Sequence, residues 1–474
     1  MKRVDMIVKA PHFYTMTGDG VGYQGNVCMV VHEGKIQGFV PDEDVERQYE
    51  AKEVLNLEHH AIFPGFIDAH MHSALNIMRG LAQDVNLWMM HGLQPFDRVL
   101  TQKERDAGSD LALIEAIKAG TTTLGDYNAK MEHVCQFIKK AGARGHLAQT
   151  VRSAKRRVYH PGELYEFDEE MGNQSIADNL ALFDKWNNQA NGRIKILFGP
   201  QGCDFLSIEQ LMRVKELAVA RHTKVHIHVQ QGDRETWQIE KRYGKRPVAL
   251  LSELGFLDEN IIAVHLTDCN DDEARVVAKS KAGMVVNPGS IAIIDGVVCP
   301  SLVFQKAGGA CALGSDQAPG NNCHNIINEM KNVTLFNKIK YGNPEVMPAY
   351  KALRMATIEG AKAIGLENDI GSLEPGKKAD FIAVDLWTPS MQPVYANPMR
   401  NIVPNLVYSA RGSEVTHSCV DGQLIMKDRK LVHIDEEAAL AKVQAYPQGI
   451  GERATEEFLK INGKLAQYMK EDKL

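Results

Sequence analysis

The chain reads Phe63-Pro-Gly-Phe-Ile-Asp-Ala-His70-Met-His72 at a point where an apolar run finishes in two histidines. The apolar part, over residues 61–67, is typical of a buried strand. Residues two apart on a strand point to the same side, so His70 and His72 can present two imidazoles to one point in space. Two imidazoles placed in this way can bind a metal ion, although the pair alone is weak evidence for a site.

Three further apolar runs end in a side chain that can bind a metal. His228 closes the run 224–229, His265 closes the run 261–266, and Asp316 follows the run 311–314. A single buried histidine is as often a core residue bonded to the backbone as a ligand, but four such strand ends in one chain are hard to explain in that way. The four runs together therefore indicate a metal site.

The composition excludes several classes of protein. The 474 residues and the 44% hydrophobic content are enough for a large barrel and a second domain. A formal net charge of -6 argues against nucleic acid or an anionic membrane as the main partner. No apolar run approaches the roughly 20 residues that span a bilayer, and no signal peptide is visible. The eight cysteines form no Cys-x-x-Cys pair, so we expect a reduced, cytoplasmic protein.

The ends of the chain and its middle differ in pattern. Strand-like, turn-rich segments begin the chain and return late, with a hairpin signal at Asp421-Gly422. Between them, strand and helix patterns alternate, which predicts an α/β fold with a (β/α)8, TIM-type barrel. We expect this barrel over 63–368, a small β-sandwich domain formed from both chain ends (1–62 and 369–445), and a C-terminal helical segment over 446–474. Active sites of such barrels lie at the C-terminal strand ends, where the candidate ligands fall.

Four motifs resemble those of the amidohydrolase superfamily. They are Pro64-Gly-Phe-Ile-Asp-Ala-His70-Met-His72, Ala119-Gly-Thr-Thr-Thr123, Gly314-Ser-Asp316 and Gly371-Ser-Leu-Glu-Pro-Gly-Lys377-x-Ala-Asp380. Together with the two later histidine strands, they look like the branch of atrazine chlorohydrolase, triazine hydrolase and the aminohydrolases, which includes guanine and S-adenosylhomocysteine deaminases. The resemblance covers most of the chain and implies the same barrel with a split β-sandwich.

The resemblance also implies a site and a reaction. His70, His72, His228 and Asp316 would hold one divalent metal, Zn²⁺ or Fe²⁺, with a position open for water. His265 would bond this water or the substrate, and Asp316 would take the proton of the water. The activated water would attack an sp² carbon of a nitrogen-containing, heterocyclic or aromatic small molecule and release ammonia, an amine or a halide. No lysine stands at the end of the fourth strand, where relatives with two metals carry one, so we expect one metal per chain.

One position departs from the pattern of this branch. Its deaminases carry a glutamate three residues after the histidine of the fifth strand, as a proton shuttle, and this chain carries Gln231 there. Glutamine can hold a substrate by hydrogen bonds but cannot transfer a proton. Two alternatives therefore stay open: hydrolysis of an amide or urea C–N bond, and a catalytically silent barrel that binds a ligand.

Four other residues are candidate substrate contacts. Arg152 follows the third strand and could bind an anionic group. Trp88 and Phe96 lie in the long loop after the first strand, where they could cap a planar ring or pack in the core. Asn325 lies shortly after Asp316 and could contact the substrate or cap a helix. We also expect a homodimer or a higher homo-oligomer, with the last helix available to pack on a partner.

Overall fold

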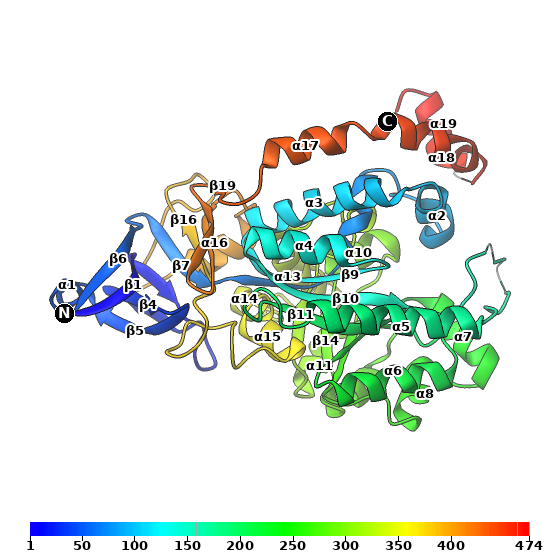
Figure 1. The fold of residues 1–474 in the computed structure, drawn as a ribbon, viewed down its shortest axis with the longest axis horizontal. Coiled ribbons are helices and arrows are strands. Elements are labelled where there is room, and N and C mark those ends of the chain that lie inside the picture. Colours follow the sequence, from blue (N-terminus) through cyan, green and yellow to red (C-terminus); the bar gives the residue numbers. More distant parts are fainter. Residues whose placement is uncertain (158, 161, 462, 474) are drawn as a thin grey trace.

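A computed structural model of the chain describes residues 1–157, 159–160, 162–461 and 463–473. At its centre lies a sheet of eight parallel strands in the order β15-β14-β13-β12-β11-β10-β9-β8 (Figure 1). The strands are β8 (Phe66–Met71), β9 (Thr121–Asn128), β10 (Arg144–Val151), β11 (Ile194–Pro200), β12 (Val225–Val229), β13 (Ile261–His265), β14 (Gly283–Val286) and β15 (Cys311–Leu313). A parallel bridge between Met71 and Asp316 brings the two edges of the sheet together. The predicted (β/α)8 barrel is confirmed, in a nearly closed form.

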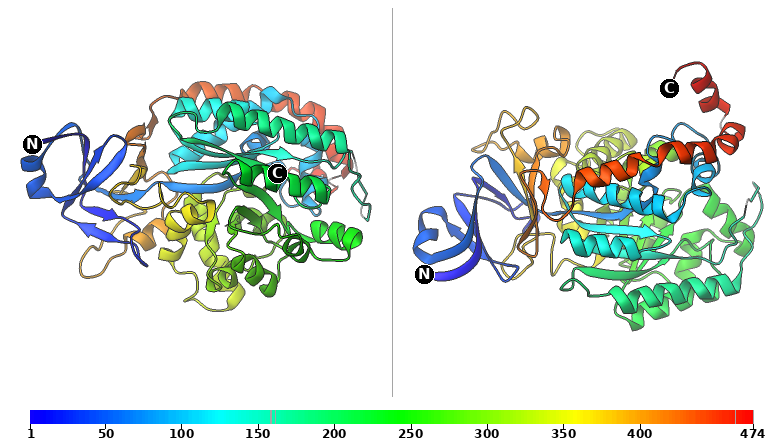
Figure 2. Two further views of the ribbon diagram at one scale, coloured as in Figure 1. Left: turned by 60° about the horizontal axis from the view of Figure 1, so that its bottom comes forward. Right: turned by 45° about the horizontal axis from the view of Figure 1, so that its top comes forward.

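Helices alternate with these strands and cover the outside of the barrel (Figures 1 and 2). Side chains begin several of them: Thr101 and Glu104 form a reciprocal capping box at α3, and Ser207 caps α6. The barrel helices are α3 (Gln102–Lys118), α4 (Glu132–Ala141), α5 (Glu169–Trp186), α6 (Ile208–Ala220), α7 (Asp233–Tyr243), α8 (Pro247–Glu253), α9 (Asp271–Lys279), α10 (Pro288–Ile294), α11 (Ser301–Lys306), α12 (Ala318–Asn321), α13 (Ile326–Tyr341), α14 (Ala349–Met355) and α15 (Ile358–Ile364). The loop from β8 to α3 contains the helical turns η1 (Ser73–Met78), η2 (Met89–Leu93) and α2 (Gln94–Asp97).

Strands from both ends of the chain form two sheets beside the barrel, at the left of Figure 1. The four-stranded sheet has the order β5-β4-β1-β6 and the seven-stranded sheet the order β19-β18-β17-β16-β7-β2-β3. Their elements are β1 (Lys2–Lys9), β2 (His12–Tyr14), β3 (Tyr23–Gly25), β4 (Val27–His32), β5 (Lys35–Pro41), α1 (Asp42–Gln48), β6 (Tyr49–Asn56), β7 (His60–Pro64), β16 (Phe381–Asp385), α16 (Ile402–Tyr408), β17 (Val415–Val420), β18 (Gln423–Lys427) and β19 (Lys430–Leu431).

Phe63 pairs with Ile382 across β7 and β16, so segments distant in sequence are joined in one layer. One apolar cluster contains Met29 from the smaller sheet and Phe13 and Phe381 from the larger sheet. The chain ends therefore form separate sheets next to the barrel, as expected. The residue limits given above for the individual domains stay a prediction.

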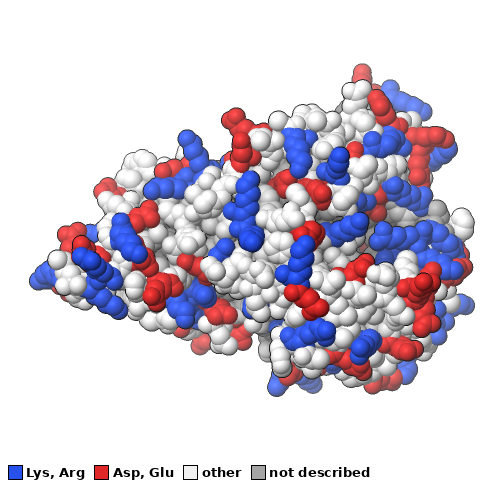
Figure 3. All heavy atoms as spheres, in the orientation of Figure 1, with Lys and Arg blue, Asp and Glu red and all other residues white. Residues whose placement is uncertain are grey.

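The last three helices are α17 (Glu436–Gln444), α18 (Pro447–Ile461) and α19 (Gly463–Lys470); α17 packs along α3, α18 packs on α2, and α19 follows α18 at the end of the chain (Figure 2). Glu436 accepts a hydrogen bond from Lys118 at 2.6 Å, and the ring of Phe458 lies 5.4 Å from that of Phe96. The C-terminal segment thus packs on its own chain. None of the described helices combines the length and the apolar content that crossing a membrane requires. Figure 3 shows Lys and Arg interspersed with Asp and Glu over the visible face.

Candidate active site

Five side chains with metal-binding atoms meet at the C-terminal ends of the barrel strands. His70 and His72 stand at the end of β8, His228 and His265 near the ends of β12 and β13, and Asp316 just after β15. Ligand atoms of His70, His72 and His228 lie within 4.8 Å of one another, as do those of His70, His265 and Asp316. Asp316 Oδ1 is 3.6 Å from Nε2 of both His70 and His72. The structure therefore brings together all five residues singled out from the sequence.

The donor set fits a divalent metal ion. Among the described residues, His70 Nε2, His265 Nε2 and Asp316 Oδ1 are buried polar atoms without a hydrogen-bond partner. Leaving such an atom unsatisfied costs about 1–3 kcal/mol, so several in one place call for a ligand. Imidazole nitrogens with a carboxylate oxygen are the ligands that Zn²⁺ and Fe²⁺ accept.

In three of the histidines, the ring nitrogen Nδ1, which points away from the shared point, contacts another group of the barrel. His72 Nδ1 donates to the carbonyl oxygen of Tyr127 at 2.6 Å, and His228 Nδ1 donates to that of Gln201 at 2.7 Å. A carbonyl oxygen only accepts, so Nδ1 carries the proton and Nε2 keeps its lone pair for the shared point. His70 Nδ1 lies 2.9 Å from His226 Nε2, which can accept in the same way.

His265 is held in the opposite manner. The amide nitrogen of Asn287 lies 3.0 Å from His265 Nδ1, and an amide nitrogen only donates. Nδ1 of His265 is therefore the acceptor, and the ring proton sits on Nε2, which faces the site. His265 is thus a hydrogen-bond donor toward a water or a substrate, whereas the Nε2 atoms of His72 and His228 are lone-pair donors.

Asp316 presents one oxygen to the site and anchors the other. Its Oδ2 accepts hydrogen bonds from Ser290 Oγ at 2.5 Å and from Gln317 Nε2 at 3.4 Å. Asp316 and His265 both have left-handed backbone conformations, with φ of 60° and 78°. Such φ values are costly for residues with a side chain and cluster at functional sites, where the surrounding structure enforces them.

Burial favours the neutral form of His70, His228 and His265. It lowers the pKa of His70 and of His228 well below the ordinary value, and neighbouring imidazoles lower both further. Burial also lowers the pKa of His265 to about 4, although Asp316 opposes this shift. Neutral imidazoles are the form that binds metals, so the electrostatics agree with the geometry.

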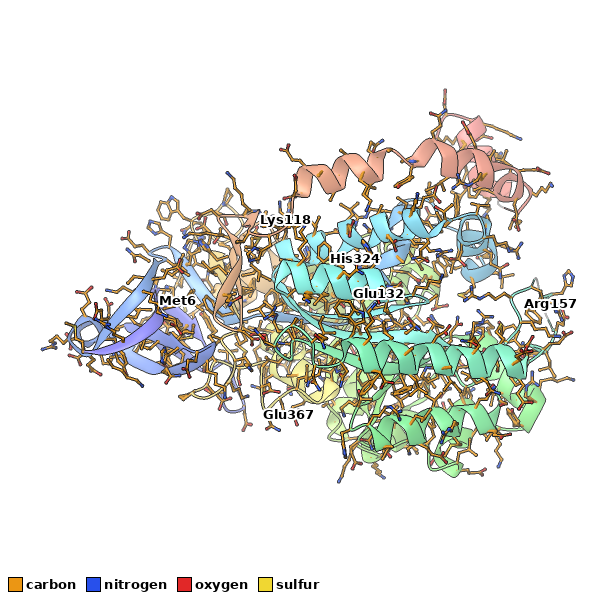
Figure 4. The ribbon with its side chains drawn as sticks, viewed as in Figure 1. Met6, Lys118, Glu132, Arg157, His324 and Glu367 are labelled. Atoms are coloured by element: carbon orange, nitrogen blue, oxygen red, sulfur yellow. The ribbon has the colours of Figure 1, made fainter. Side chains whose placement is uncertain are left out.

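A buried polar layer supports the edge where β8 meets the end of β15. Asp68 accepts hydrogen bonds from Ser315 Oγ at 2.5 Å and from the Ser315 backbone N–H at 3.0 Å. Ser315 Oγ also lies 2.8 Å from Nδ1 of His324, which is fully buried and is labelled in Figure 4. Burial raises the pKa of Asp68 to about 7. These contacts join the backbone just before His70 to the backbone just before Asp316.

The predicted substrate contacts are placed in different surroundings. Gln231 follows β12 and is half-buried, and Arg152 follows β10, with its guanidinium 4.9 Å from the ring centre of Phe205. Trp88 is 5% exposed, and its buried Nε1 has no partner among the described residues.

Two of the four other residues predicted to contact the substrate, Phe96 and Asn325, have side chains engaged in structural contacts. Phe96 packs against Phe458 in an apolar cluster with Met78, so its ring serves packing. Asn325 caps α13 through Ile327 N–H and donates to the carbonyl of Arg411 at 2.7 Å, so both ends of its amide are used. In each case the structural alternative considered for the residue accounts for its contacts.

Sequence reasoning missed three residues that shape the site: His226, Asn287 and Ser290. His226 precedes the ligand candidate His228 by two positions, so strand alternation could have placed it on the same side. Asn287 and Ser290 follow β14, at a strand end where barrel enzymes place functional groups. Their partners, His265 and Asp316, come from other strands and could not be read locally.

The chain is similar to known proteins over most of its length. The model of the Amidohydrolase family matches residues 61–425. A 5-methylthioadenosine/S-adenosylhomocysteine deaminase of Syntrophomonas wolfei is 34% identical over 394 residues, which cover 82% of this chain and 87% of that protein. A 5'-deoxyadenosine deaminase of Methanosarcina mazei is 31% identical over 442 residues, covering 93% and 97%.

Solved structures share the fold. An adenosine deaminase from Xanthomonas campestris with bound zinc superposes with a TM-score of 0.86 at 24% identity and covers 95% of this chain and 99% of its own. The atrazine chlorohydrolase of Arthrobacter aurescens, complexed with zinc, superposes with a TM-score of 0.81 at 18% identity and covers 93% and 99%.

Proposed function

The chain belongs to the amidohydrolase family of hydrolases, which act on carbon–nitrogen bonds, and from this premise we propose that it deaminates an adenosine-like heterocycle. The relatives from Syntrophomonas wolfei and Methanosarcina mazei are deaminases of adenosine derivatives by name. The observation that carries the proposal is the pairing of a proton acceptor, Asp316 Oδ1, with a proton donor, His265 Nε2, beside three further imidazoles.

His70, His72, His228 and Asp316 would hold the metal, one per chain, with Zn²⁺ first and Fe²⁺ second. When bound there, such an ion supplies Lewis acidity and lowers the pKa of a water toward about 7. We propose one ion because the end of β11 reads Gly199-Pro-Gln-Gly202 and offers no lysine to bridge a second.

The residues of the chain then divide the proton transfers. Asp316 takes a proton from the attacking water, and Ser290 holds the second carboxylate oxygen so that the first keeps its direction. His265 donates from Nε2 to the oxygen that becomes bonded to the ring carbon. As the carbon–oxygen bond forms, the π pair of the ring C=N bond moves onto the ring nitrogen. The proton held by Asp316 then passes to the amino group, the π bond re-forms as the bond to that group breaks, and ammonia leaves. The carboxylate is restored, and the ring keeps the oxygen as C–OH or its keto tautomer.

Gln231 supports a second candidate reaction. An amide at this position cannot protonate a poor leaving group, whereas a halide leaves without a proton. Hydrolytic removal of a halide from a similar ring is therefore the alternative that Gln231 favours. Hydrolysis of an amide or urea expels an amine that needs a proton, and it stays a further alternative. The substitution Gln231→Glu distinguishes the two reactions. If the protein is a deaminase, the added carboxylic acid should raise the rate of ammonia release, because a general acid contributes about 10²–10⁴-fold.

The direct test is turnover by the zinc-loaded protein. The panel consists of 5'-deoxyadenosine, methylthioadenosine, S-adenosylhomocysteine, guanine, a chlorinated triazine, an anilide and a urea, with ammonia and chloride both measured. We expect ammonia from an adenosine derivative, and none with Asp316→Asn. Tight binding of a nucleoside with full metal content and no product would contradict an enzyme and favour a ligand-binding barrel.

We further propose that the protein is cytoplasmic and forms a homodimer or a higher homo-oligomer. Sedimentation would test the oligomeric state.

A further inference from the structure

The turn that follows β12 has an unusual backbone. Gln230 has a φ of 49° and Gly232 a φ of 82°, so the residues on both sides of Gln231 adopt left-handed conformations. Such a conformation is unfavourable for a residue with a side chain and persists only where neighbours enforce it. The Gln230 amide supplies one anchor, because it donates to the carbonyl of Asp268 at 3.2 Å. The direction of the Gln231 side chain depends on this turn.

A second anchor comes from the first turn of α7. Glu235 is 0% exposed, and its Oε2 accepts the backbone N–H of Gln231 at 2.9 Å. Its Oε1 accepts from Cys203 Sγ at 3.3 Å. Cys203 lies two residues after Gln201, the residue whose carbonyl holds His228 Nδ1. Glu235 therefore links the turn after β12 to the segment after β11.

Among the described side chains, no Lys, Arg or His donates a hydrogen bond to the buried Glu235 carboxyl. The neighbouring Arg234 guanidinium bonds Asp204 and lies 3.2 Å from Tyr165 Oη. Burial, with Asp204 nearby, raises the pKa of Glu235. Burial of a carboxyl group lowers the stability of a fold unless hydrogen bonds satisfy its oxygens. A hydrophobic residue would often fill the same space with a smaller loss of stability. Its retention between two strand ends calls for a role at the site.

We propose that Glu235 is a positioning residue that holds the turn 230–232 so that the Gln231 side-chain amide faces the substrate. This inference rests on the proposed function, since it requires Gln231 to contact a substrate. Both oxygens of Glu235 accept hydrogen bonds from protein donors, which suits an anchor better than a proton carrier.

Two substitutions separate an anchor from a proton carrier. Glu235→Gln keeps an oxygen that can accept from Gln231 N–H, so KM and kcat should stay within about twofold of wild type. Glu235→Ala removes the acceptor and should raise KM about tenfold with little change in kcat, because binding common to ground and transition states is lost. A fall in kcat of several orders of magnitude in Glu235→Gln would overturn the proposal and make Glu235 a proton carrier.

A double-mutant cycle with Gln231→Ala tests whether Glu235 acts through Gln231. If it does, Glu235→Ala should have no further effect on KM in the Gln231→Ala background. Additive effects would mean that Glu235 only stabilises the fold, and would overturn the proposal. Glu104→Ala is the matched control, because it removes another buried carboxylate at a helix start, in the capping box of α3. It should lower stability and leave KM unchanged.

A measurement that does not depend on catalytic activity separates the test of Glu235 from the test of the proposed function. Amide hydrogen exchange in the peptide that contains Gln231 should accelerate at least tenfold in Glu235→Ala and stay at the wild-type rate in Glu235→Gln. Unchanged exchange in Glu235→Ala overturns the proposal whatever the activity. If the wild-type protein turns over none of the panel, the proposed function fails, and the cycle is read from the Kd of 5'-deoxyadenosine measured by calorimetry.

Discussion

Each histidine of the site is defined by what its second ring nitrogen meets. Backbone carbonyl oxygens hold His72 and His228 with the proton on Nδ1, whereas the amide of Asn287 holds His265 with the proton on Nε2. Identical side chains thus acquire opposite roles from one neighbour each. The identity of that neighbour, an acceptor or a donor, is the property that a substitution can change.

Asn287→Asp should reverse the tautomer of His265. An aspartate oxygen would accept from Nδ1, so Nε2 would lose its proton and could no longer donate into the site. We expect kcat/KM to fall about 10²–10⁴-fold, the contribution typical of a positioned proton donor. Steady-state kinetics with elemental analysis would check this, and the metal content should be unchanged. Activity within tenfold of wild type would show that the donor role of His265 is wrong.

At the scale of the element, the barrel strands carry buried ionisable groups. His146, in β10, is 3% exposed, and its Nδ1 has no partner among the described residues. Burial, together with Lys224 and Lys195, lowers its pKa from 6.5 to about 3. Between these two values the unfolded chain binds a proton that the folded strand does not. The stability contributed at this position is therefore full above pH 6.5 and is lost as the pH falls.

His146→Asn should remove this pH dependence. Below pH 6.5, the free energy of unfolding of the wild type minus that of the variant should fall by about 1.4 kcal/mol per pH unit. Urea unfolding at pH 7, 6 and 5 measures this difference, and the other titrating groups cancel in it. The same substitution at the exposed His222 is the control. A difference that stays constant from pH 7 to pH 5 would contradict the prediction.

At the scale of the whole molecule, a metal ion would join the two edges of the barrel. His70 and His72 stand on β8, and Asp316 follows β15, the strand at the other edge of the sheet. An ion that binds the folded chain and not the unfolded one stabilises it by about 4 kcal/mol at a thousandfold excess over its Kd. Closure of the barrel and occupancy of the site are thus linked.

Removal of metal should lower the melting temperature of the wild-type protein by several degrees, and added Zn²⁺ should restore it. Thermal scans before and after treatment with a chelator measure this shift, and elemental analysis should find about one metal per chain. His70→Ala should hold little metal and melt at the same temperature with and without chelator. Two metals per chain would show that the mononuclear assignment is wrong.

The barrel and the positions of the candidate ligands could be predicted from the sequence because both depend on local patterns. Alternating apolar runs and helical periods predicted the strands, and His70, His72, His228, His265 and Asp316 each stand at the end of such a run. Once a parallel barrel is assumed, all C-terminal strand ends share one face, so convergence follows without knowledge of any contact.

Only the tertiary structure decided which side chains are partners. Asn287 meets His265, and Phe96 meets Phe458, across strands or helices far apart in the sequence. Glu235 lies only four residues after Gln231, but its second partner, Cys203, follows another barrel strand. No local period encodes such pairs, because they depend on the register of neighbouring strands and on how helices dock. The chain alone therefore determined where the candidate ligands stand, and barrel closure decided what each of them can do.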